Sequence, residues 1–120
     1  MGKLMIKRNS QLVLDEVRVA NTYWSRLIGL MGKKEFSGKG LLFPRSNSIH
    51  MWMMSMPIDV IFLKEIQPGK EWSIVQLHRS VRPWKLLPLL CARADDTLEV
   101  SAGLIEQHQL REGEVLCIAS

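Results

Sequence analysis

The segment from Gly40 to Lys64, GLLFPRSNSIHMWMMSMPIDVIFLK, constrains the fold more than any other part of the chain. It contains two runs of residues that favour β-strands, Ser48 to Met54 and Ile58 to Leu63, with Pro57 between them. Successive side chains of a strand point to opposite faces, and both faces of the first run are largely apolar. We therefore expect this strand to be covered on both sides or to lie across the interior of a barrel.

Short strand-like runs recur along the rest of the chain, separated by turn residues. Further strands are predicted at Leu4–Ile6, Leu12–Ala20, Leu41–Phe43, Trp72–His78, Leu98–Val100 and Val115–Ala119. One helix is predicted from about Asn21 or Thr22 to Met31, and a second from Ser101 to Leu110, with Ser101 as its N-cap. The pattern indicates a single α+β domain over residues 1–120, mainly β: a small, strongly curved sheet or barrel of about seven or eight short strands with two helices.

Composition narrows the class of protein. Apolar residues make up 47% of the chain and charged residues 23%, a balance typical of globular domains rather than disordered ones. The N-terminal residues MGKLMIKRNSQ lack the apolar core of an export signal, and no apolar run approaches the roughly 18 residues of a membrane span. We expect a soluble cytoplasmic protein in which Cys91 and Cys117 stay reduced.

Four segments span nearly the whole chain in an order that one known family shares. They are RLIGLMGK at Arg26 to Lys33, GLLFPRSNSIHMWMMSMPIDVIFL at Gly40 to Leu63, PWK at Pro83 to Lys85, and VSAGLIEQHQLREGE at Val100 to Glu114. Together they resemble the domain of unknown function 192 family, a group of small prokaryotic proteins. The resemblance implies a compact β-rich domain and no established catalytic residue or cofactor.

A cluster of soft ligands is the first candidate for chemistry. His50, Met51, Met53, Met54 and Met56 offer an imidazole and several thioethers, which suit Cu(I). Strand alternation, however, places Met51 and Met53 on one face and His50 and Met54 on the other, and methionine is a common filler of cores. The three histidines and two cysteines also lack the spacing of zinc ligands. We therefore expect neither a bound metal nor another cofactor.

Asp59 is the second candidate, because apolar residues flank it on both sides. A buried carboxylate is costly unless it is paired or hydrogen-bonded. One interpretation makes the chain a small enzyme in which Asp59 and His50 form an acid/base pair. The other makes Asp59 an acceptor of backbone N–H groups at the bend near Pro57, where it would fix a corner of the sheet.

A binding module without catalysis is the function that the sequence favours. Trp52, Met54 and Phe62 could line a concavity near the segment from Arg79 to Leu90. Such a concavity would take a small apolar ligand, or a peptide or protein partner.

Nucleic-acid binding is a further alternative. The segment RSVRPWK combines Arg79, Arg82 and Lys85 with Trp84, and basic grooves with aromatic platforms bind single strands. The same residues could contact a protein partner, or Trp84 could simply pack into the core.

Overall fold

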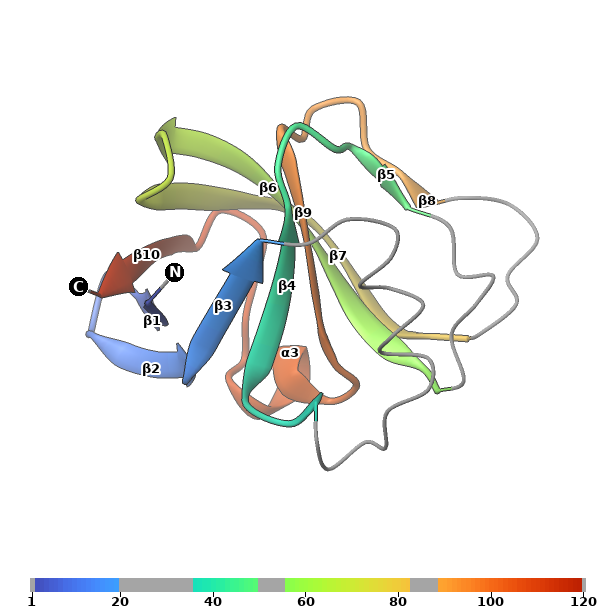
Figure 1. The fold of residues 1–120 in the computed structure, drawn as a ribbon, viewed down its shortest axis with the longest axis horizontal. Helices are drawn as coiled ribbons and strands as arrows, with labels where there is room; N and C mark the ends of the chain where they lie inside the picture. Colours follow the sequence, from blue (N-terminus) through green and yellow to red (C-terminus); the bar gives the residue numbers. More distant parts are fainter. Residues whose placement is uncertain (1, 20–35, 50–55, 83–88, 120) are drawn as a thin grey trace.

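The computed structural model describes residues 2–19, 36–49, 56–82 and 89–119 (Figure 1). Its main feature is an eight-stranded sheet with the strand order β2-β1-β10-β7-β6-β9-β4-β3, beside a two-stranded sheet of β5 and β8. The strands are β1 (Lys3–Ile6), β2 (Gln11–Leu14), β3 (Glu16–Val19), β4 (Lys39–Phe43), β5 (Ser48–Ile49), β6 (Ile58–Gln67), β7 (Glu71–Val81), β8 (Leu89–Leu90), β9 (Asp96–Ser101) and β10 (Val115–Ala119). The described part also contains one short helix, α3 (Leu104–Gln107).

The two end strands of the large sheet are neighbours in sequence. Only Asp15 separates β2, which pairs with β1, from β3, which pairs in parallel with β4. The Val17 N–H donates to the Gly2 carbonyl at 3.1 Å, so β3 also touches the segment that leads into β1. A full ladder therefore does not close the sheet. The sheet curves until its two ends meet at the bent segment around Asp15, between β2 and β3 (Figure 1).

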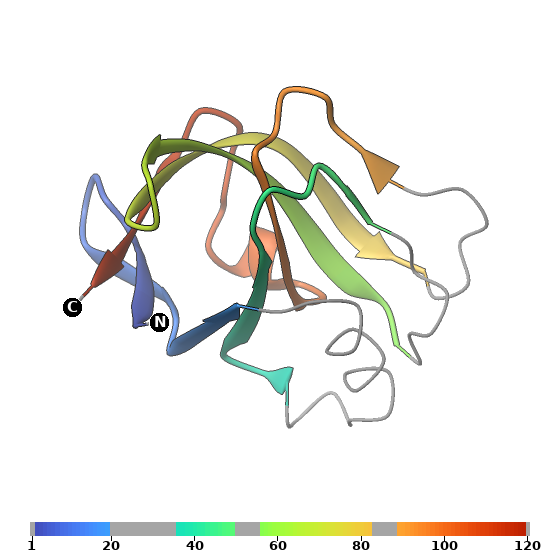
Figure 2. The ribbon, with the colours of Figure 1, turned by 45° about the horizontal axis from the view of Figure 1, so that its top comes forward.

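The longest elements are β6 and β7, which form a hairpin that arches across the molecule (Figure 2). Both extend beyond the predicted runs, because the polar residues after Leu63 and before Trp72 continue the pairing as far as Gln67 and Glu71. Gly69 closes the turn with a φ of 71°, a conformation that favours glycine.

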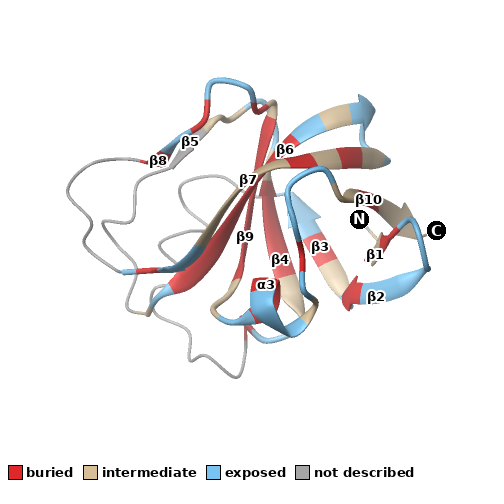
Figure 3. Cartoon of the chain, turned by 180° about the vertical axis from the view of Figure 1, so that it is seen from behind, coloured by how far each residue is buried: buried red, intermediate tan, exposed pale blue. Residues whose placement is uncertain are grey.

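Apolar side chains form two clusters on opposite faces of the sheet. The buried residues run along the central strands β6, β9 and β4 (Figure 3). The interior cluster collects inward side chains from β1, β2, β3, β4, β6, β7, β9 and β10, and α3 adds Leu104 and Ile105. The outer cluster covers the other face of β4, β6 and β7. Residues Ile58–Leu63 of β6 are all buried. Ile58, Val60 and Phe62 belong to the outer cluster, and Ile61 and Leu63 belong to the interior cluster.

Glycine is required at position 40 of β4, because the side chain of Leu14, next to the bent segment, packs directly against it. A Cβ atom on Gly40 would lie 2.5 Å from Cδ1 of Leu14 and 3.2 Å from Cδ1 of Leu98. Both leucines are buried in the interior cluster, so neither has room to move aside.

The predicted α+β, mainly β architecture on a curved sheet is confirmed, and the two predicted helices are not. The second helix is much shorter than predicted, since β9 runs through Ser101 and the N-cap is Gly103. The first helix, predicted at 21–31, lies outside the described residues. Of the strand predicted from Ser48 to Met54, the structure describes Ser48–Ile49 as β5. No helix in the described ranges is long and apolar enough to cross a bilayer.

Candidate functional site

Asp59 lies on β6 and is fully buried, as its apolar neighbours suggested. Its Oδ1 accepts the Ser80 N–H at 2.8 Å, and its Oδ2 accepts the N–H groups of Gly103 at 3.1 Å and Ile105 at 3.0 Å. The carboxylate thus holds β7 and the first turn of α3 against β6. The hydrogen-bonded interpretation of Asp59 matches these contacts, although the donors come from distant segments and not from the bend near Pro57.

This arrangement also explains why α3 begins later than the sequence suggests. No side chain of the helix itself caps its N-terminus. The Asp59 carboxylate satisfies the backbone N–H groups of Gly103 and Ile105, which would otherwise have no partner at a helix start. Because this carboxylate from β6 caps α3, Ser101 is not needed as the N-cap of the helix.

The outer face of the sheet carries polar side chains that the sequence analysis did not single out. Strand register places Glu99 of β9 and His78 of β7 on either side of Val60, on one face. Glu99 has no exposed surface, although the outer cluster on this face is apolar. Gln76, one row away, has a buried amide oxygen that accepts no hydrogen bond within the described part of the chain.

A sequence signal for Glu99 existed. Glu99 stands between Leu98 and Val100 in a strand, flanked by apolar residues just as Asp59 is. His78 gives no such signal, because one of its neighbours, Leu77, is apolar and the other, Arg79, is charged. Only the pairing of β6 with both β7 and β9 brings the carboxylate and the imidazole into one row.

The predicted binding residues divide between buried, exposed and undescribed positions. Phe62 is fully buried in the outer cluster, and its ring meets the His78 ring edge-on with centroids 5.6 Å apart. Arg79 and Arg82 are exposed near the end of β7. The others fall outside the described residues: His50, Met51, Trp52, Met53, Met54, Trp84 and Lys85.

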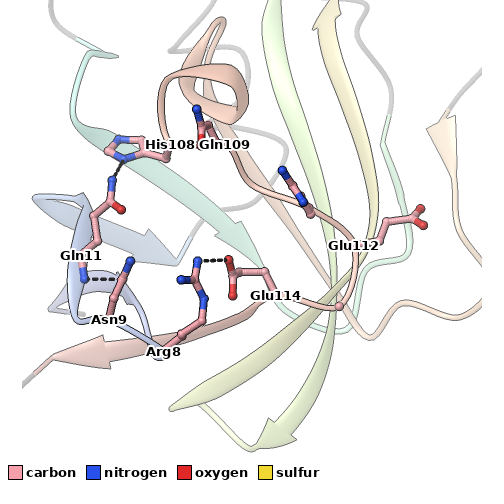
Figure 4. A pocket seen from close by; sticks show the side chains of 9 residues that line it. Arg8, Asn9, Gln11, His108, Gln109, Glu112 and Glu114 are labelled. Atoms are coloured by element: carbon pink, nitrogen blue, oxygen red, sulfur yellow. Dashed lines mark hydrogen bonds and ion pairs between the residues drawn. The ribbon is translucent and has the colours of Figure 1, made fainter.

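A pocket of about 610 Å³ opens between two loops that are far apart in sequence (Figure 4). One wall is the turn between β1 and β2, and the other is the segment from the end of α3 to the start of β10. We call it the polar pocket, and it is lined by Arg8, Asn9, Gln11, His108, Gln109, Arg111, Glu112, Gly113 and Glu114.

Local turn chemistry shapes both walls. The Asn9 side chain accepts the Gln11 N–H at 3.0 Å, and Ser10 has a φ of 58°, which together reverse the chain between β1 and β2. On the other wall, Gly113 has a φ of 88°, and its N–H donates to the Ile74 carbonyl at 2.7 Å. Each wall is thereby anchored to the sheet.

Two side-chain contacts join the walls. The Arg8 Nη2 lies 3.2 Å from Glu114 Oε1, and the Gln11 Nε2 lies 3.1 Å from His108 Nδ1 (Figure 4). An amide nitrogen can only donate, so the second contact requires a neutral imidazole with its proton on Nε2. Burial lowers the pKa of His108 from the ordinary value of 6.5, which favours this neutral form.

The charges of the polar pocket are not all neutralised. Arg111 is exposed and forms no ion pair with any residue in the described ranges. Glu112 points away from the Arg8–Glu114 pair (Figure 4). The pocket therefore offers one guanidinium without a carboxylate partner next to several amide and imidazole groups.

No group of three or more His, Cys, Asp or Glu side chains suited to a metal forms among the residues the structure describes. Cys91 and Cys117 are both free thiols, and Cys91 is buried.

Solved structures with the same fold come from two bacteria. One is a protein of unknown function from Novosphingobium aromaticivorans, with a TM-score of 0.66 and 17% identity over 95% of this chain and 81% of that chain. The other, from Sinorhizobium meliloti, is described as a candidate transcription regulator. Its TM-score is 0.68 and its identity 19%, over 95% of this chain and 88% of that chain. At these identities the likeness concerns the fold alone.

A comparison with curated proteins finds none that matches this chain. A family model does match, over residues 4–118, and its description reads DUF192, Uncharacterized ACR. The match confirms the resemblance seen in the sequence, and the chain belongs to this family.

Proposed function

We propose that the chain is a binding module that takes a polar ligand, or a polar segment of a peptide, into the polar pocket. The pocket itself carries the proposal. Its volume of about 610 Å³ falls in the range of small-molecule sites, which is about 300–1,000 Å³. Its walls come from turns that are held by the sheet and joined to each other, so little order has to be gained on binding.

The chemistry of the walls decides the class of ligand. The sequence favoured a small apolar ligand near Phe62, but Phe62 is fully buried. The polar pocket is lined instead by charged and amide side chains, which select partners by hydrogen bonding. Asp59 supports a role without catalysis, because backbone N–H groups already occupy both of its carboxylate oxygens.

NMR titration of the ¹⁵N-labelled protein tests the proposal. The probes are the common amino acids, triglycine and succinate, added one at a time. At least one should shift the amide signals of residues 8–11 and 108–114. The Gln11→Ala variant should weaken that binding about fivefold or more, since it removes a wall residue and its contact with His108.

The control is Gln107→Ala, which removes an exposed glutamine of α3 that does not line the pocket. It should bind as the unmodified protein does. Shifts centred on other residues, or equal weakening in the two variants, would show that the polar pocket is not the binding site.

A second candidate function follows from Glu99. A buried carboxylate and an imidazole on either side of Val60 could act as an acid/base pair, in place of Asp59 and His50. Residues that serve chemistry are often not optimal for stability. Because Gln keeps the size and the hydrogen-bonding capacity of the side chain, replacing a Glu99 that serves chemistry should change the free energy of unfolding by less than about 1 kcal/mol.

Urea unfolding of Glu99→Gln beside Glu106→Gln, an exposed position in α3, measures this. A loss of about 2 kcal/mol or more in Glu99→Gln alone would make Glu99 a structural group and remove the base from the second candidate.

Nucleic-acid binding by the segment Arg79–Lys85 stays a prediction, supported by the exposure of Arg79 and Arg82.

A further inference from the structure

We infer that the polar pocket recognises its ligand through an oxyanion, a carboxylate or a phosphate group, held chiefly by Arg111. The inference rests on the proposed function and narrows it to one chemical class. It follows from which charged groups around the pocket are already committed and which are not.

The carboxylates of the pocket are poor candidates for holding a cation. Glu114 is engaged by Arg8 at 3.2 Å. Glu112 points away from that pair and from the wall formed by the β1–β2 turn (Figure 4). A cationic ligand would have to compete with Arg8 for Glu114, and it would meet the positive charge of Arg111 nearby.

Several hydrogen-bond donors of the pocket are not engaged by the contacts described above. Arg111 carries five N–H donors in a planar fork that matches a carboxylate or a phosphate, and no described residue pairs with it. Arg8 keeps donors beyond the one contact that it makes with Glu114. Because His108 accepts through Nδ1, its other ring nitrogen is also a donor.

Exposure does not argue against the site. Arg111 is exposed, so its guanidinium is hydrated before binding, and a single exposed ion pair contributes little. Specific binding therefore needs the second guanidinium and the neutral donors of the opposite wall. The two contacts that join the walls keep these donors within the same pocket as Arg111.

The test is an NMR titration at constant ionic strength with four probes: inorganic phosphate, succinate, the dication putrescine and the neutral compound glycerol. Phosphate, succinate or both should shift the amides of residues 108–114 in the unmodified protein. Arg111→Gln should raise the Kd for that anion about tenfold or more, the loss expected when a charged hydrogen-bonded contact is removed. Arg18→Gln, an exposed arginine on β3 that does not line the pocket, should leave the Kd unchanged.

The probes separate the outcomes. Binding of phosphate alone assigns the pocket to phosphate esters, binding of succinate alone assigns it to carboxylates, and either supports the inference. Binding of putrescine or glycerol in the pocket without binding of an anion overturns the inference and leaves the proposed function standing. Shifts that sodium chloride reproduces at equal ionic strength, or equal losses in Arg111→Gln and Arg18→Gln, overturn the oxyanion site. If no probe binds, and no amino acid or peptide binds either, both proposals fail.

Discussion

Asp59 shows how one side chain can connect three segments of the chain. Each of its hydrogen bonds joins a charged acceptor to a backbone donor, a type that contributes about 1.5–3 kcal/mol. Asn in its place keeps a single acceptor oxygen and turns an NH₂ group toward at least one backbone N–H. We expect Asp59→Asn to lower the free energy of unfolding by about 2–4 kcal/mol, measured from urea unfolding monitored by tryptophan fluorescence.

The matched control is Asp15→Asn, which makes the same change at an exposed position and should shift the unfolding free energy by less than about 0.5 kcal/mol. An Asp59→Asn protein as stable as the unmodified one would contradict the structural role of Asp59. It would return Asp59 to the list of catalytic candidates, together with His50.

The sequence predicted the burial of Asp59 but not its partners. Apolar neighbours on both sides are enough to place a strand residue inside, and Asp59 is indeed fully buried. Its donors at Ser80, Gly103 and Ile105 follow 21, 44 and 46 residues later. No local pattern specifies such contacts, because they depend on how the strands are ordered in the sheet.

At the scale of elements, hydrophobic patterning located most strands, and polar residues obscured where they end. The run Ile58–Leu63 is buried on both faces and was evident from its composition. The residues that lengthen β6 to Gln67 are mostly exposed, so only cross-strand pairing with β7 reveals them as strand. For α3 the prediction was wrong in the opposite sense, because the helix is shorter than predicted. Its apolar periodicity suggested a start at Ser101, whereas the Asp59 carboxylate caps the helix at Gly103.

The polar pocket could not be predicted from elements alone. Its two walls are polar turns separated by about a hundred residues, and neither contains a motif with a known role. The pairing of β1 with β10 brings them together, as Lys7 and Val115 show by their backbone hydrogen bond at 2.9 Å. Long-range pairing of the two ends of the chain is the information that periodicity lacks.

At the scale of the whole molecule, the bent segment around Asp15 makes the two ends of the sheet depend on each other. Strands from both ends contribute to one interior cluster, including Leu4, Leu14 and Val17. Opening either end would therefore expose the apolar core shared by the rest. We expect the Val17 amide, which donates to Gly2, to exchange its hydrogen only when the whole domain unfolds.

Native-state hydrogen exchange in increasing urea measures this expectation. The exchange free energy of the Val17 amide should fall within about 1 kcal/mol of that of Ile61 in the central strand, and the two should fall with the same urea slope. The Lys70 amide is the internal control, because it bonds to the Gln67 carbonyl at the exposed tip of the β6–β7 hairpin and should exchange by local opening. If Val17 instead exchanges as readily as Lys70, the sheet ends open independently, and the polar pocket, whose one wall is the β1–β2 turn, would lose the rigidity on which tight binding depends.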